Sequence, residues 1–122
     1  MSLIAIRGAI TCDENSTAAI LDATRQLMSA LIDKNHLDPN HVISIIFSAT
    51  PDLNAAYPAQ AVRQMGWSQV PMLCLQEMYV TESLPRCLRV LIHYEATSPL
   101  SPCHVYLGDA QSLRPDWAHM NK

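Results

Sequence analysis

Residues 70–79 are almost all apolar, yet they carry one carboxylate, that of Glu77. A run of apolar and β-prone residues this short is typical of a buried strand rather than of a helix. Burying a carboxylate is costly unless the group is paired or hydrogen-bonded. Arg89 is the one charged residue of a second apolar run, residues 87–92. The fold must therefore provide this acid and this arginine with partners in apolar surroundings.

Apolar runs and turn residues predict the order of elements along the chain. Strands are expected over residues 3–9, 42–50, 70–79, 86–95 and 104–107. A long helix is expected from about Thr17 to Asn35, where apolar residues recur at helical spacing, and a short helix over residues 58–65, which Gly66 closes. Asp38 before Pro39 predicts a further single turn. The continuous apolar character of residues 42–50 indicates burial on both faces of that strand.

This order predicts one α/β (α+β) domain over residues 1–122, with a mixed β-sheet and helices on one face. Residues 115–122 are expected to form a mobile C-terminal tail. Only 16% of the residues are charged, whereas soluble domains average about 25%. Part of the surface is therefore expected to be covered by other copies of the chain.

The composition disfavours several classes of function. The net charge is −3 and no basic run is present, so no nucleic-acid partner is expected. No apolar run reaches the ~18 residues of a membrane span, and the N-terminus does not resemble a signal peptide. These features predict a cytoplasmic protein with no membrane partner. Free thiols are accordingly expected at all the cysteines, which are Cys12, Cys74, Cys87 and Cys103.

The sequence also lacks the motifs of common cofactor and nucleophile sites. It has no phosphate-binding glycine loop, no dinucleotide fingerprint and no nucleophile elbow, and its histidines do not recur at metal-ligand spacing. No cofactor and no metal are therefore expected. Cys74 is conceivable as a nucleophile near Glu77, but alternate residues of a strand share a face and these two have opposite parity. A structural thiol is the favoured interpretation of Cys74.

Arg7, Glu77, Arg89 and Tyr106 are the polar residues that stand out in apolar segments. Each of them alone is readily explained as a structural ion pair or a satisfied buried group. Three charges in three separate strands are harder to explain in this way, because a buried ion pair contributes little net stability. Two arginines against one glutamate also leave a positive surplus. A binding site for a small anion accounts for that surplus.

Short motifs run in order through nearly the whole chain. They occupy residues 6–9, 48–53, 57–59, 61–63, 70–71, 74–78, 87–90, 104–107 and 113–116. The most specific are Ser48-Ala49-Thr50-Pro51-Asp52-Leu53 and Gln76-Glu77-Met78. In composition and spacing these motifs resemble the monofunctional, trimeric α/β-barrel chorismate mutases, the class typified by bacilli.

The resemblance implies an isomerase that converts chorismate to prephenate by a unimolecular [3,3] (Claisen) rearrangement in phenylalanine and tyrosine biosynthesis. It implies a homotrimer that assembles as a pseudo-α/β-barrel, with active sites between subunits and without cofactor or metal. Arg7 would hold a substrate carboxylate together with Tyr106. Arg89 would face the ether oxygen, and Glu77 would accept a hydrogen bond from the ring hydroxyl.

The other substrate-binding positions implied by the resemblance come from three regions. They are Leu73, Cys74, Leu75 and Gln76 on the third strand, Tyr57, Ala59 and Arg63 from the neighbouring subunit, and Leu113 and Arg114 at the mouth. The chain departs from the family at Gln60, where lysine is common, at Tyr57, where phenylalanine is usual, and at Glu82-Ser83, where glycines are frequent.

Two other functions fit the same residues less well. A non-catalytic trimeric small-anion-binding or regulatory module on the same fold could use the arginine-rich pocket. A hydrolase or deaminase on a related trimeric barrel would need an activated water or a nucleophile. A plain anion binder has less use for a carboxylate in its pocket, so Glu77 favours the mutase.

Overall fold

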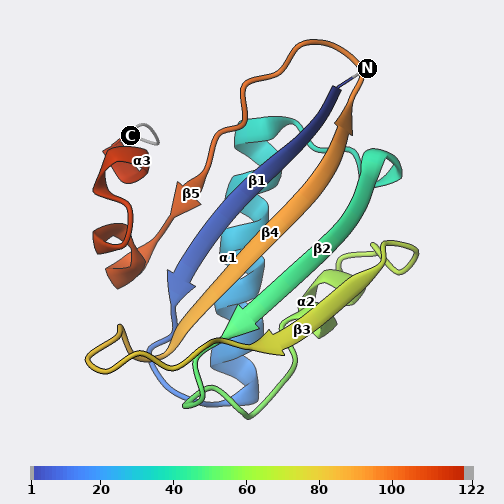
Figure 1. Cartoon of the computed structure of the whole chain (residues 1–122). Helices are drawn as coiled ribbons and strands as arrows, with labels where there is room; N and C mark the ends of the chain where they lie inside the picture. Colours follow the sequence, from blue (N-terminus) through green and yellow to red (C-terminus); the bar gives the residue numbers. More distant parts are fainter. Residues whose placement is uncertain (1, 120–122) are drawn as a thin grey trace.

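The computed structural model describes residues 2–119 and contains a five-stranded mixed sheet (Figure 1). The strands are β1 (Ser2–Thr11), β2 (Val42–Ala49), β3 (Met72–Gln76), β4 (Cys87–Ala96) and β5 (Val105–Tyr106). The helices are α1 (Thr17–Asn35), α2 (Ala59–Gln64) and α3 (Pro115–His119), and the 3-10 turns are η1 (Pro39–His41) and η2 (Gly108–Ser112). The fold class and the order of elements as far as β5 are confirmed, whereas η2 and α3 were not expected from the sequence.

The strand order is β3-β2-β4-β1-β5, which places β4 in the centre of the sheet. Strand β4 pairs antiparallel with both of its neighbours, β1 and β2. The outer strands β3 and β5 pair parallel to β2 and β1. The parallel pairing of β2 with β3 requires a crossover, and the segment containing α2 supplies it. Arg89, near the start of β4, therefore lies in the middle of the sheet.

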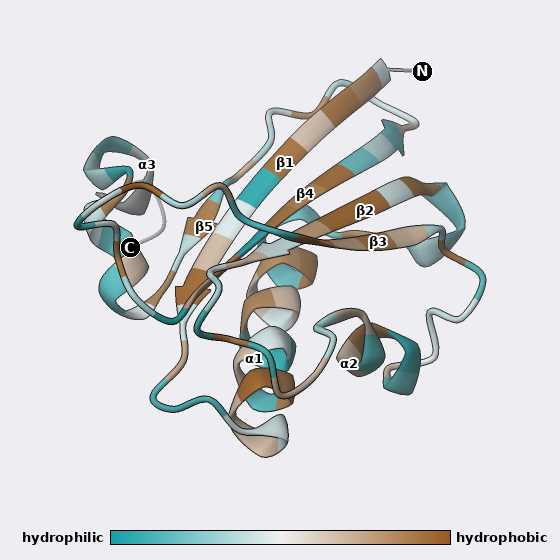
Figure 2. Ribbon diagram, turned by 60° about the horizontal axis from the view of Figure 1, so that its bottom comes forward, coloured by the Kyte–Doolittle hydropathy of each residue, from teal (hydrophilic) through white to brown (hydrophobic). Residues whose placement is uncertain are grey.

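Helices α1 and α2 cover one face of the sheet, as Figure 2 shows from a second direction. Helix α1 begins after Ser16, whose hydroxyl accepts a hydrogen bond from Ala19 N–H at 3.1 Å, and this cap satisfies a backbone donor of the first turn. The main core lies between α1 and the sheet. It includes the fully buried Ile6, Leu27, Phe47 and Ile92.

We call the face opposite α1 and α2 the open face. Leu73 and Leu75 of β3 are 56% and 50% exposed on it, and Ile43 of β2 is 48% exposed. The expectation of a buried strand over residues 70–79 is therefore wrong, and so is burial on both faces of residues 42–50. The reason is position in the sheet, because β3 is an edge strand and α1 and α2 both lie on the other face.

The C-terminal elements η2 and α3 lie beside β5 at the edge of the sheet (Figure 1). Leu113 and Trp117 pack against a small second core that contains Ala9, Cys87 and Tyr106. Residues 120–122 of the expected tail lie outside the described residues, and the mobility of residues 115–122 stays a prediction. Within residues 2–119, no helix is long and apolar enough to cross a membrane.

Candidate active site

Pairing across the sheet places one residue from each strand in a single row. The row consists of Tyr106 on β5, Ala9 on β1, Arg89 on β4, Ser48 on β2 and Leu75 on β3. Side chains of paired residues point to the same side of a sheet, so this row lies on the open face. The small side chains of Ala9 and Ser48 stand on either side of Arg89 and leave room for its guanidinium.

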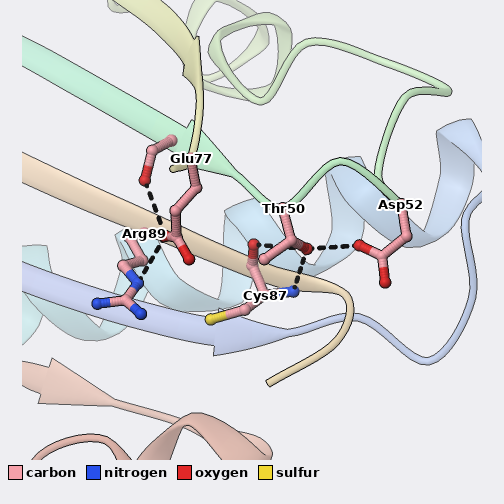
Figure 3. A network of polar contacts seen from close by, with 6 residues as sticks. Thr50, Asp52, Glu77, Cys87 and Arg89 are labelled. Atoms are coloured by element: carbon pink, nitrogen blue, oxygen red, sulfur yellow. Dashed lines mark hydrogen bonds and ion pairs between the residues drawn. The ribbon is translucent and has the colours of Figure 1, made fainter. Parts of the chain in front are cut away.

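Glu77 and Arg89 meet at this row, although β2 separates the strands from which they come (Figure 3). Glu77 directly follows β3, and its N–H donates to the Ala49 carbonyl at 2.8 Å, which extends the ladder between β2 and β3. Arg89 Nε lies 2.7 Å from Glu77 Oε1. Ser48 Oγ donates to the same carboxylate oxygen at 3.3 Å. The side chain of Glu77 is 15% exposed and that of Arg89 is 32% exposed, so the carboxylate is largely removed from water while the guanidinium stays accessible.

Only one edge of the Arg89 guanidinium is used in this pair. Its two Nη groups form no ion pair with a second carboxylate of the described chain, and Figure 3 shows them extending away from Glu77. A guanidinium held through Nε presents its remaining donors in a fixed direction. Arg89 can therefore offer these donors to an electronegative atom without losing its contact with Glu77.

Tyr106 is surrounded by arginines and lacks a polar partner. The residue is 2% exposed, and its hydroxyl has no hydrogen-bond partner among residues 2–119. Burial raises the pKa of Tyr106, and the positive charges of Arg7, Arg114 and Arg89 oppose this rise. Three guanidinium charges therefore act on the Tyr106 side chain. A buried hydroxyl without a partner is uncommon and is consistent with a ligand-binding role.

His104 and Trp117 form a stack next to Arg7. The backbone N–H of Arg7 donates to His104 Nδ1 at 3.0 Å, and the His104 ring centroid lies 3.9 Å from that of Trp117. The guanidinium carbon of Arg114 lies 3.4 Å from the Trp117 ring centroid. Arg114 Nη2 also pairs with Asp116 Oδ2 at 2.9 Å. The C-terminal segment is thereby attached beside Arg7 and Tyr106.

Only some of the other positions expected at the site are brought to this group within one chain. Tyr57, Cys74, Leu75 and Gln76 line a cleft of about 500 Å³ near the ends of β2 and β3, and Ser48 lines it as well. Cys74 pairs with the buried Phe47, so it lies on the face opposite Arg89. Ala59 is buried in α2, and Arg63 is exposed on the same helix. Leu73 is exposed on the open face, whereas Leu113 and Arg114 lie close to Tyr106 and Trp117.

Sequence reasoning missed Ser48, His104 and Trp117 as members of the site. Ser48 and His104 belong to motifs recognised in the sequence, but their contacts depend on pairing between distant segments. Ser48 lies 29 residues before Glu77, and His104 lies 97 residues after Arg7. The only local signal was the presence of polar residues next to short apolar strands.

Comparison with known proteins identifies the family of the chain. The model of the family described as chorismate mutase type I matches residues 3–117. The chain belongs to this family. The resemblance and the chorismate mutase function expected from the sequence are confirmed, as is assignment to the isomerases of aromatic amino acid biosynthesis.

Individual relatives cover nearly the full length. Chorismate mutase AroH of Bacillus subtilis is 43% identical over 118 residues, which are 95% of this chain and 93% of that protein. Chorismate mutase AroH of Thermus thermophilus is 42% identical over 113 residues, 91% of this chain and 93% of that protein. A solved structure of a chorismate mutase from Clostridium thermocellum superimposes with a TM-score of 0.85 at 39% identity, and the match covers 89% of this chain and 98% of that one.

The position of His104 makes a pH dependence of stability testable. Burial lowers the pKa of His104, and the charges of Arg7 and Arg114 lower it further. An unfolded histidine has a pKa of about 6.5. As pH falls below that value, the unfolded chain takes up a proton that the folded chain does not, so the free energy of unfolding should decline. Urea unfolding at pH 7.5, 6.5 and 5.5 measures this decline.

The matched variants are His104→Asn and His36→Asn. The first keeps an oxygen that can accept the Arg7 N–H but cannot titrate, so its stability should decline less steeply with falling pH. The second makes the same exchange at an exposed residue with φ 53°, a conformation that asparagine also adopts. Parallel pH profiles for wild type and His104→Asn would exclude His104 as a source of the decline.

Proposed function

We propose that this chorismate mutase converts chorismate to prephenate at the group formed by Arg7, Glu77, Arg89 and Tyr106. The observation that carries the proposal is the ion pair between Glu77 and Arg89, which leaves the Nη donors of Arg89 unpaired beside Arg7 and the unpartnered Tyr106 hydroxyl. Chorismate has two carboxylates, an enol-pyruvyl ether and a ring hydroxyl. The cluster offers cationic donors for the first two and a carboxylate acceptor for the third.

The reaction is an internal rearrangement, so the site has to select a conformer rather than supply a reactant. The ether C–O bond breaks while a C–C bond forms between the enol-pyruvyl carbon and the ring, in one cyclic shift of electrons. No proton is transferred. Holding the two ends of the substrate together removes much of the entropic barrier. Arg7 and Tyr106 perform this task by fixing a carboxylate, and Glu77 does so by binding the ring hydroxyl.

Arg89 acts on the charge that develops during the reaction. As the C–O bond breaks, negative charge accumulates on the ether oxygen, and the Nη groups donate to it. Glu77 and Ser48 hold Arg89 in place before the charge appears, so little reorganisation is needed. A preorganised donor of this kind typically contributes about 3–4 kcal/mol to transition-state stabilisation.

The complete site requires a neighbouring subunit in this proposal. The protein is a cytoplasmic homotrimer whose active sites lie between subunits. Leu3, Leu73 and Leu75 expose apolar surface that a partner would cover. Tyr57, Ala59 and Arg63 do not reach Arg89 in their own chain, and they would complete the site of the adjacent one. The low charged fraction of 16% supports such burial.

The first test follows the loss of chorismate absorbance in the ultraviolet with wild type and with Arg89→Lys. Lysine keeps the charge but cannot bind Glu77 and the ether oxygen with one rigid planar group. We expect kcat to fall by roughly 10²–10³, with the unfolding transition unchanged. Arg25→Lys, on the exposed side of α1, is the control and should keep full activity. Turnover near that of wild type in Arg89→Lys, or no acceleration by wild type, would refute the proposal.

The second test is Tyr106→Phe. The hydroxyl has no protein partner in the described chain, so its removal should not lower the free energy of unfolding. A hydrogen bond to a charged group is worth about 1.5–3 kcal/mol, so KM should rise about 10- to 100-fold with a smaller change in kcat. In the control Tyr94→Phe, the lost hydroxyl accepts from Asp38 N–H at 3.0 Å, and stability rather than KM should change. An unaltered KM in Tyr106→Phe would remove this residue from the binding site.

Assembly is tested by mixing two inactive variants. Arg89→Lys and Arg63→Ala each disable a different side of a shared site, so co-expressed mixed trimers should contain some intact sites and regain activity. Mixed trimers of Arg89→Lys chains and Glu77→Ala chains should not regain activity, because both substitutions disable the same half of the shared site. Sedimentation equilibrium should show a trimer at micromolar concentration. A fully active monomer would contradict the shared site.

A further inference from the structure

The segment after β2 is bound to the start of β4 by a short polar network (Figure 3). Thr50 Oγ1 accepts from Cys87 N–H at 3.0 Å and donates to Asp52 Oδ1. The backbone N–H of Thr50 donates to the Cys87 carbonyl at 3.0 Å. The second carboxylate oxygen of Asp52 accepts from Arg86 N–H at 2.9 Å. Thr50 is only 5% exposed, whereas Asp52 and Arg86 at the outer end of the network are exposed.

Arg86 has an unusual backbone conformation at this point. Its φ is +47°, in the left-handed region that residues with a Cβ seldom adopt. Two contacts with Cys12 hold it from the β1 side, since Arg86 Nε donates to the Cys12 carbonyl at 3.0 Å and Cys12 N–H donates to the Arg86 carbonyl at 2.8 Å. Asp52 holds it from the other side through the Arg86 N–H. The conformation persists because these neighbours over-determine it.

The network lies next to both members of the ion pair. Cys87 is two residues before Arg89 in β4 and therefore shares its face. Ala49 directly precedes Thr50, and its carbonyl accepts the N–H of Glu77. A change at Arg86 would shift the first residues of β4 against the end of β2. Such a shift would move Arg89 away from Glu77.

We propose that Asp52 is a positioning residue for the rearrangement. By accepting the Arg86 N–H, Asp52 keeps the Arg86 backbone in the left-handed region and thereby holds Arg89 Nε against Glu77. Asp52 touches neither Arg89 nor Glu77, so it acts only through the start of β4. This inference rests on the proposed catalytic role of Arg89. The charge state of Asp52 supports it: burial would raise the pKa of Asp52, but hydrogen bonds from Thr50 and Arg86 outweigh burial and lower it, so the carboxylate stays ionised.

The test compares Asp52→Ala with the double variant Asp52→Ala/Arg86→Gly. Misplacing a catalytic group by about 1 Å can cost ~10² in rate, so kcat of Asp52→Ala should fall roughly 10- to 100-fold. Glycine adopts positive φ without a Cβ penalty, so it should restore the start of β4 without the carboxylate and recover most of kcat. The exposed Asp13→Ala is the control that should retain activity. Arg86→Gly alone measures what is lost with the contact between Arg86 Nε and the Cys12 carbonyl, and kcat of the double variant is compared with it.

A second readout follows Arg89 independently of turnover. The ¹⁵N–¹H resonance of Arg89 Nε, assigned by its loss in Arg89→Lys, should shift in Asp52→Ala and return in the double variant. If Asp52→Ala does not fold, Asp52→Asn with and without Arg86→Gly makes the same comparison, because an amide has one oxygen for two donors.

The outcomes separate the inference from the proposed function. Wild-type kcat and an unshifted Arg89 resonance in Asp52→Ala would overturn the inference. A loss of kcat in Asp52→Ala that the added Arg86→Gly does not reverse would also overturn the inference, because the effect of Asp52 would then not depend on the Arg86 conformation. A resonance that shifts and returns while kcat stays constant would uphold the positioning by Asp52, and it would refute the catalytic role of Arg89 instead.

Discussion

The ion pair between Glu77 and Arg89 is the interaction on which the site depends. A partly buried pair of this kind contributes little net stability, because desolvation offsets much of the Coulomb attraction. Its value lies in direction: the 2.7 Å contact uses Arg89 Nε and leaves both Nη groups for another atom. Ser48 binds the same carboxylate oxygen and so limits where Glu77 can move. The pair therefore converts a flexible arginine into a donor of fixed orientation.

The central position of β4 makes this arrangement possible. Because β4 lies between β1 and β2, Arg89 has Ala9 on one side and Ser48 on the other, and Tyr106 follows one strand further on. The same topology places α1 and α2 on the opposite face and leaves Leu73 and Leu75 uncovered. The open face thus combines a polar cluster with apolar surroundings, which suits a site completed by association.

Local patterns were sufficient for elements whose signals are local. The bounds of α1 at Thr17–Asn35 and the turn begun by Asp38 and Pro39 follow from caps and periodicity, and both are confirmed. The prediction that residues 70–79 form a buried strand was wrong, because an apolar sequence does not distinguish a central strand from an edge strand. The insertion of β2 between β3 and β4 was also beyond local signals. For that reason Ser48 was not identified, while the lone charges at Glu77 and Arg89 were.

The charge states of the groups near Arg89 also explain why Arg89 pairs with Glu77 rather than with Cys87. Cys87 lies on the same face two residues away and is the nearest thiol that could compete with Glu77 as an anion. Burial raises the pKa of Cys87 to about 11, although the positive charge of Arg89 opposes the rise. The thiol therefore stays neutral at physiological pH, and the guanidinium has no thiolate to turn toward. Because the rearrangement transfers no proton, a site built from the Arg89–Glu77 ion pair and a neutral thiol needs no group to change its charge during turnover.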